Sequence, residues 1–224
     1  MLIKVCGMRE PENIHAVESL GVDMIGLIFY PKSARYVEML SSRAGILPDY
    51  AAADYAAAGQ APARVGVFVD DMPQNIVTRV YNFSLDYVQL HGRESRTMIE
   101  NLRATLDPDI RRGVKIIKAI SIASADDIRQ TEAYEGAVDL FLFDTKCPTV
   151  GGSGRQFDWS ALSHYTGHTP FLLSGGIGPD DIARIRDFRH PQFAGIDLNS
   201  KFETAPGMKD VAQLRKFIEA VRQQ

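Results

Sequence analysis

The stretch Val138-Asp-Leu-Phe-Leu-Phe-Asp144 decides the expected fold. It is a nearly continuous apolar run that ends in a carboxylate, and it shows little in/out alternation. Continuous runs of this kind are typical of strands covered on both faces, as in parallel sheets. The chain contains eight runs of comparable length, most of them equally continuous. They are Leu2–Cys6, Met24–Tyr30, Arg64–Val69, Asp86–His91, Val114–Ile120, Val138–Asp144, Pro170–Ser174 and Ala194–Leu198.

Amphipathic stretches separate these runs and predict helices. Gly21 gives a C-cap signal, Pro73 is favoured in a first helical turn, and Asp158 can cap the stretch that follows it. The expected helices are Glu12–Leu20, Ser42–Leu47, Pro73–Asn82, Glu94–Leu106, Ser124–Tyr134, Trp159–Tyr165, Pro179–Phe188 and Lys209–Arg222. The alanine-rich segment Tyr50–Ala63 is compatible with helix, although Gly59 leaves its edges undefined.

The alternation of strands and helices predicts an α/β fold, a TIM (β/α)₈ barrel. The 224 residues divided among eight units give 28 per unit, slightly fewer than the roughly 31 of a typical barrel of about 250 residues. A doubly wound parallel sheet shows the same alternation and is the alternative. No low-complexity linker or internal repeat divides the chain, so residues 1–224 are predicted to form a single domain.

Composition excludes several classes of function. Lys and Arg number 25 against 28 Asp and Glu, a net charge of −3 at pH 7, so no general attraction to nucleic acid is expected. The longest apolar run is far below the roughly 20 residues that span a bilayer, and the segment Met1–Gly7 does not have the features of a signal peptide. With only Cys6 and Cys147, the chain is expected in the reducing cytoplasm.

In a barrel of this kind the active site lies at the carboxyl ends of the strands. The polar or glycine residues at those ends are Cys6-Gly7, Lys32–Arg35, Asp70-Asp71, His91-Gly92, Ser121, Asp144–Lys146, Ser174–Gly176 and Asp197–Ser200. Glycines after the seventh strand and the polar end of the eighth strand suggest a phosphate site, because backbone N–H groups there can face an anion. The segment Gly151–Gly154 can add N–H donors, although each glycine pair is also compatible with a plain turn.

Two strand ends carry groups suited to proton transfer. Cys6 and Asp144 are a plausible general base and acid, although packing of the thiol and capping by the carboxylate are the alternatives. Arg35 suits a bidentate contact to a carboxylate or phosphate, or else is a surface arginine. His91 is the only histidine at a strand end, so no metal site is predicted.

Taken together, the motifs resemble those of the phosphoribosylanthranilate isomerase family. The blocks that carry the resemblance are KVCGM (Lys4–Met8), GLIFYPKSARYV (Gly26–Val37), GVFV (Gly66–Val69), VQLHG (Val88–Gly92), FDTK (Phe143–Lys146), GGSGRQFDW (Gly151–Trp159), LSGGI (Leu173–Ile177) and GIDLNSKFE (Gly195–Glu203). They run nearly end to end and occur in order. Ala34 stands where the family commonly has proline.

The resemblance implies a cofactor-free isomerase. It would convert N-(5-phosphoribosyl)anthranilate to 1-(2-carboxyphenylamino)-1-deoxyribulose 5-phosphate by an Amadori rearrangement, the third step of the tryptophan branch from chorismate. Cys6 would be the general base and Asp144 the general acid, while Arg35 would pair with the anthranilate carboxylate. The residues expected to bind substrate are Arg35, His91, Gln89 and Asp197, and those expected to bind phosphate are Gly152, Gly154, Gly175, Gly176, Asn199 and Ser200.

These roles require unusual protonation states, because a free thiol has a pKa of about 8.5 and a free aspartate one of about 3.9. Either the barrel mouth or the substrate must lower the pKa of Cys6 and raise that of Asp144. Two alternative functions remain at this stage, a metal-dependent pentose-phosphate epimerase and a non-catalytic binder of a phosphorylated ligand. The expected partner is a small phosphorylated substrate, and both a monomer and a homodimer are compatible with the sequence.

Overall fold

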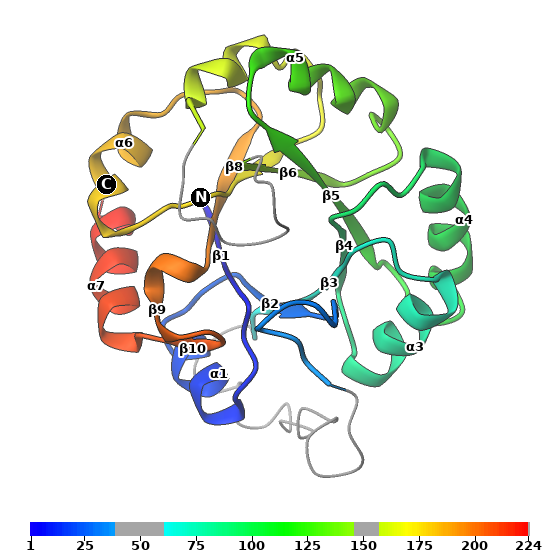
Figure 1. Cartoon of the computed structure of the whole chain (residues 1–224), viewed down its shortest axis with the longest axis horizontal. Helices are drawn as coiled ribbons and strands as arrows, with labels where there is room; N and C mark the ends of the chain where they lie inside the picture. Colours follow the sequence, from blue (N-terminus) through cyan, green and yellow to red (C-terminus); the bar gives the residue numbers. More distant parts are fainter. Residues whose placement is uncertain (39–60, 146–156, 224) are drawn as a thin grey trace.

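The structure, a computed structural model, describes residues 1–38, 61–145 and 157–223. Eight parallel strands close into a barrel in chain order, with β8 hydrogen-bonded back to β1 (Figure 1). The strands are β1 (Leu2–Cys6), β2 (Met24–Ile28), β3 (Ala63–Phe68), β4 (Tyr87–Leu90), β5 (Lys115–Ile122), β6 (Leu140–Thr145), β7 (Phe171–Leu173) and β8 (Phe193–Leu198). This closed order confirms the predicted barrel and excludes the doubly wound sheet, which has two open edges.

All eight predicted strands are confirmed, each with ends within two residues of the expected ones. The prediction succeeds because each strand is buried on both faces, so that apolar residues occur at consecutive positions and the run marks the strand directly.

The helices surround the barrel (Figure 1). They are α1 (Pro11–Glu18), α3 (Pro73–Phe83), α4 (Arg96–Leu106), α5 (Ala125–Ile128), α6 (Ile182–Asp187) and α7 (Val211–Arg222), with 3₁₀ helices η1 (Arg129–Ala133), η2 (Trp159–His164), η3 (Pro179–Asp181) and η4 (Ser200–Phe202). The expected helices 124–134 and 179–188 are thus each part α-helix and part 3₁₀ helix. The expected helix 159–165 is a 3₁₀ helix, in which Asp158 accepts an N–H from Ser160 as predicted. Short connectors of this kind commonly adopt the tighter 3₁₀ geometry.

A two-stranded hairpin was not expected from the sequence. Strands β9 (Glu203–Ala205) and β10 (Met208–Lys209) pair antiparallel between η4 and α7. The predicted start of the last helix at Lys209 is therefore wrong, because Asp210 caps the helix by accepting the N–H of Gln213. The hairpin packs against α1 (Figure 1). Its Glu203 and Lys209 side chains contact Arg35 and Asn199, which follow β2 and β8.

The barrel separates two apolar cores. The larger lies between strands and helices, and the smaller fills the barrel interior with Met24, Val65, Ile117, Ala119, Leu140, Leu142 and Leu172. Leu2 packs against the inner cluster, and alternate residues of a strand share one face. Lys4 and Cys6 consequently face the interior above Leu2. The inner core is therefore apolar near the start of β1 and polar toward its end, where the site lies.

Within the described ranges, no helix combines the length and apolarity needed to cross a membrane. The expected helix 42–47, most of the alanine-rich segment 50–63 and Cys147 lie outside the described residues. The assignment of residues 1–224 to one domain stays a prediction.

Candidate active site

The expected acid and base come from opposite sides of the barrel mouth. Cys6 ends β1 and Asp144 lies near the end of β6. Because the strands are parallel, both side chains lie at the carboxyl end of the barrel. In the closed ring β1 neighbours β8, then β7, then β6, so the two strands are three steps apart out of a possible four. A small molecule in the mouth would lie between the two groups.

The Cys6 thiol is buried at the interior wall, with the residue 4% exposed. Its register partner on β2 is Gly26, where a Cβ atom would lie only 2.7 Å from the sulfur. Burial raises the pKa of the Cys6 thiol, while the ammonium of Lys4, which shares a hydrogen bond with it, opposes that rise. Of the two sources that the sequence left open, the substrate-free protein does not lower the pKa of the Cys6 thiol, because desolvation outweighs the nearby charge.

A buried ion pair lies beside the thiol. Lys4 Nζ donates to Oδ1 of Asp197, its register partner on β8, at 2.8 Å. The Ser174 hydroxyl donates to the other Asp197 oxygen at 3.2 Å. Burial disfavours the charged form of Lys4, but Asp197 and Cys6 raise its pKa above the ordinary value. Both carboxylate oxygens of Asp197 are therefore engaged within the protein.

The site raises the pKa of the Asp144 carboxyl group. Burial raises the pKa of Asp144 to about 6, and the negative charge of Asp197 adds to this rise. The N–H of Thr145, 2.8 Å from Oδ1, opposes the rise. Of the two sources that the sequence left open, the protein itself therefore raises the pKa of Asp144.

His91 approaches the same carboxyl. Its Nε2 atom lies 3.5 Å from Oδ2 of Asp144. Burial lowers the pKa of His91 to about 4, with Lys118 and Lys4 adding to the effect. His91 is thus neutral near pH 7 and its contact with Asp144 is not an ion pair. The structure brings together two residues that the sequence placed on separate strand ends.

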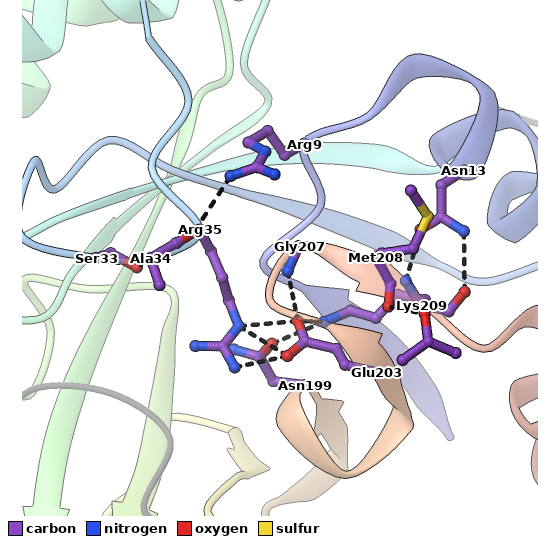
Figure 2. A network of polar contacts seen from close by, with 11 residues as sticks. Arg9, Asn13, Ser33, Ala34, Arg35, Asn199, Glu203, Gly207, Met208 and Lys209 are labelled. Atoms are coloured by element: carbon purple, nitrogen blue, oxygen red, sulfur yellow. Dashed lines mark hydrogen bonds and ion pairs between the residues drawn. The ribbon is translucent and has the colours of Figure 1, made fainter.

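Arg35, in the loop after β2, is bound by a carboxylate of the β9–β10 hairpin (Figure 2). Its Nε donates to Glu203 Oε1 at 2.8 Å, and Nη2 donates to Oε2 at 2.6 Å. Lys209 Nζ donates to the same carboxylate at 2.6 Å and to Asn199 Oδ1 at 2.7 Å. The arginine is therefore part of a buried network, and the plain surface reading of Arg35 does not hold.

The loops after β7 and β8 lie side by side, because these strands are paired. Gly175 and Gly176 have φ of 86° and 70°, a conformation that glycine adopts without strain. Ser200 begins η4, the Asn199 side chain accepts from Lys209, and the Asn199 carbonyl accepts from the N–H of Phe202. Gly152 and Gly154, the other expected phosphate residues, lie outside the described residues.

Sequence reasoning missed Lys4, Glu203 and Lys209 as members of the site. Lys4 carried a signal, since it is a lone charge within an apolar strand and alternates with Cys6. Glu203 carried only its place at the end of the block Gly195–Glu203, and Lys209 carried no signal. The contact of Glu203 with Arg35 spans 168 residues of chain, so the sequence could not reveal it. Gln89, which was expected to bind substrate, is 1% exposed on β4 and its Oε1 has no hydrogen-bond partner in the described part of the chain.

Fold and site together define the class of protein. A closed (β/α)₈ barrel with a thiol, a carboxyl of raised pKa and an arginine at its mouth is a barrel enzyme equipped for proton transfer. Among the residues described here, no three His, Cys, Asp or Glu side chains form a group suited to a metal ion.

Comparisons with known proteins identify the family. The family model for N-(5'-phosphoribosyl)anthranilate isomerase matches residues 3–220. The N-(5'-phosphoribosyl)anthranilate isomerase of Parabacteroides distasonis is 48% identical over 221 residues, covering 99% of this chain and 93% of that protein. That of Phocaeicola vulgatus is 46% identical over 223 residues, covering 100% and 98%.

Solved structures with a similar fold carry the same family name. The enzyme from Thermotoga maritima has a TM-score of 0.77 at 28% identity, with all of both chains covered. A phosphoribosylanthranilate isomerase in complex with reduced 1-(o-carboxyphenylamino)-1-deoxyribulose 5-phosphate has a TM-score of 0.74 at 26% identity, again over all of both chains. The chain belongs to the phosphoribosylanthranilate isomerase family. Its activity is the isomerisation of N-(5'-phosphoribosyl)anthranilate in tryptophan biosynthesis, as the motifs implied.

Proposed function

We propose that Asp144 is the general acid and Cys6 the general base of this isomerisation. The observation that carries the assignment is their placement. The two groups lie on strands three steps apart at one barrel mouth. The charges of the buried Lys4–Asp197 pair affect the pKa of both groups. The raised pKa of Asp144 further supports the role of acid.

In the first step Asp144 gives its proton to the ring oxygen of the ribose. The C1–O bond breaks as the lone pair of the anilino nitrogen forms a C=N bond, which leaves an open-chain iminium ion. Asp144 is now a carboxylate, and the neutral imidazole of His91 is close enough to stabilise it by donating from Nε2.

In the second step the Cys6 thiolate removes the proton from C2 of the sugar. The iminium nitrogen accepts the electrons of the broken C–H bond, which gives an enolamine. Tautomerisation of the enolamine yields the ketone product. One proton leaves Asp144 and one arrives at Cys6, so the reaction balances without a redox partner. Positioned acid and base groups contribute on the order of 10²–10⁴-fold each.

The ends of the substrate fit the two sides of the mouth. Arg35 binds the anthranilate carboxylate, and backbone N–H groups of Gly175, Gly176 and Ser200 bind the phosphate. Gln89 offers its unpartnered Oε1 to a sugar hydroxyl. Asp197 acts through Lys4, which it holds beside the thiol.

The test is a fluorescence assay of substrate consumption with purified protein and no added metal. Cys6→Ala and Asp144→Asn are each expected to lower kcat at least about a hundredfold and to change KM less. Matched controls are Cys147→Ser, a thiol outside the motif that carries Cys6, and Asp139→Asn, a carboxylate that precedes β6 at its opposite end. Near-wild-type turnover in either test variant refutes the role of that residue.

We further propose a single-domain, cytoplasmic enzyme that needs no metal or cofactor and is a monomer or homodimer. One solved structure is of monomers generated from the dimeric phosphoribosylanthranilate isomerase of Thermotoga maritima. Light scattering distinguishes the 24.8 kDa monomer from a dimer. Loss of activity after exhaustive chelation contradicts the metal-free proposal.

A further inference from the structure

We propose that Glu203 is a positioning residue that holds Arg35 in the orientation in which it receives the carboxylate of the substrate. This inference rests on the proposed role of Arg35 and adds the element that sets its geometry. Glu203 lies on β9, in the hairpin that the sequence did not reveal.

The Arg35 guanidinium group contacts Glu203 along only one of its edges. Glu203 occupies the Nε/Nη2 edge of Arg35, with contacts of 2.8, 3.1 and 2.6 Å. Within the described chain Nη1 has no hydrogen-bond partner. Because a guanidinium has five N–H donors in one plane, the edge formed by Nη1 and the second N–H of Nη2 stays open. That edge matches a second carboxylate bidentately.

The Glu203 carboxylate is fixed by further hydrogen bonds within the hairpin. Its Oε1 accepts from Lys209 Nζ at 2.6 Å and from the N–H of Gly207 at 3.2 Å. Lys209 is in turn clamped through its backbone, because its N–H donates to Asn13 Oδ1 and its carbonyl accepts from Asn13 Nδ2 (Figure 2). The Glu203 side chain is 5% exposed. A carboxylate fixed from three directions is suited to orient the arginine and is poorly placed to move aside for substrate.

The net charge of this network is positive. Arg35 and Lys209 are cationic and Glu203 is anionic, so the three groups together carry one positive charge. The hydrogen bonds that Arg35 donates to Glu203 raise the pKa of Arg35. Burial raises the pKa of Glu203, but hydrogen bonds from Arg35 and Lys209 bring it below the ordinary value. Lys209 therefore compensates the carboxylate that orients Arg35, and the group keeps its attraction for an anion.

The experiment is a double-mutant cycle on KM with the purified enzyme and its substrate. Glu203→Gln keeps the volume and one acceptor but loses the charge and the second acceptor. We expect it to raise KM about tenfold while kcat changes less than about threefold, because contacting residues of one network are coupled. In an Arg35→Met background the same substitution is expected to change KM less than about twofold.

The control is Asp139→Asn. Asp139 also accepts from an arginine, Arg103, and from a backbone N–H, that of Ile116, but at the opposite end of the barrel. It is expected to leave KM unchanged, and thermal melting followed by circular dichroism reports whether each variant is folded.

The outcomes separate the two proposals. If Arg35→Met leaves KM unchanged, the carboxylate contact itself fails. If Arg35→Met raises KM but Glu203→Gln adds the same factor in both backgrounds, only the positioning role fails. A lower melting temperature of Glu203→Gln with wild-type KM also overturns that role. If Glu203→Gln does not fold, the cycle is run with Glu203→Asp, which retains the charge and is expected to raise KM less.

Discussion

The ammonium of Lys4 lies 2.8 Å from a carboxylate oxygen of Asp197 inside the barrel, and both charges act on the two proposed catalytic groups. Asp197 raises the pKa of Cys6 and of Asp144, whereas Lys4 lowers both. The two influences oppose each other while the pair is intact. Removing one member should therefore shift the acid and the base in the same direction.

Asp197→Asn is predicted to lower the pKa of both groups, because it removes a negative charge and leaves Lys4 uncompensated. The pKa of Asp144 should fall below about 6, as measured by carbon-13 NMR of the carboxyl groups. The pH midpoint of Cys6 alkylation should fall as well, measured in a Cys147→Ser background so that one thiol remains. Ser174→Ala, which removes only a hydrogen bond to Asp197, is the control and should move either midpoint less. Midpoints that stay fixed or move apart in Asp197→Asn contradict the shared influence.

The pH profile of kcat/KM should show reverse protonation. The active form needs a protonated Asp144, with a pKa of about 6, and a deprotonated Cys6, whose pKa is raised. Below pH 6 the acid is protonated and the rate rises with the thiolate fraction. Above pH 6 the gain in thiolate is balanced by the loss of protonated Asp144, so the rate levels off until the thiol titrates. The inflection near pH 6 should move down in Asp197→Asn. If it stays in place, that inflection belongs to the substrate and the assignment to Asp144 is wrong.

Gly26→Ala is predicted to impair catalysis more than stability. The added Cβ would lie 2.7 Å from the Cys6 sulfur and 3.0 Å from its Cα, so the thiol must shift. A misplacement of about 1 Å can cost about a hundredfold in rate, and we expect kcat to fall at least about tenfold. The matched control is Gly66→Ala on the neighbouring strand, where the Cβ would meet Leu85 and Phe68 of the outer core. Gly66→Ala should lower the melting temperature and spare kcat per folded molecule. The reverse pattern would show that Gly26 does not set the position of the sulfur.

The barrel was predictable from sequence because its signal is local. Strand β6 is buried on both faces, so its first four residues, 140–143, are all apolar, and Asp144 follows them. The hairpin was not predictable in the same way. Met208–Lys209 is two residues long, too short for a periodic pattern, and only the Pro206-Gly207 pair signals a turn there.

The site was predictable in its chemistry but not in its contacts. Cys6, Asp144 and Arg35 are recognisable as strand-end or motif residues. Their protonation and orientation depend on Lys4, Asp197, Glu203 and Lys209, which the fold brings together from the two ends of the chain. Lys4 and Asp197 are 193 residues apart, and no spacing rule links residues at such a separation.

Another buried ion pair gives a prediction about stability. Lys118 and Glu94 have side chains 2% and 3% exposed, with 3.1 Å between Nζ and Oε2. Lys118 also donates to the carbonyls of Leu90 and Gly92, which flank His91. Glu94→Gln leaves this ammonium without a compensating charge, so we expect the free energy of unfolding to fall by about 3 kcal/mol at neutral pH. Replacing both residues, in Lys118→Met with Glu94→Gln, should restore part of that loss, because an apolar side chain removes the buried charge.

The pH dependence of unfolding shows whether the uncompensated charge of Lys118 causes the stability loss in Glu94→Gln. Burial lowers the pKa of Lys118 below its ordinary value of 10.5, while Glu94 opposes that shift. Without the carboxylate, the folded-state pKa falls further below that of the unfolded chain. The unfolded state then binds the proton more tightly, and stability must rise with pH between the folded pKa and about 10.5. Urea unfolding should therefore show that the deficit of Glu94→Gln shrinks from pH 7 to pH 10. Glu94 also accepts hydrogen bonds from the backbone N–H groups of Asp70 and Gly92. A deficit independent of pH would assign the loss of stability to these hydrogen bonds.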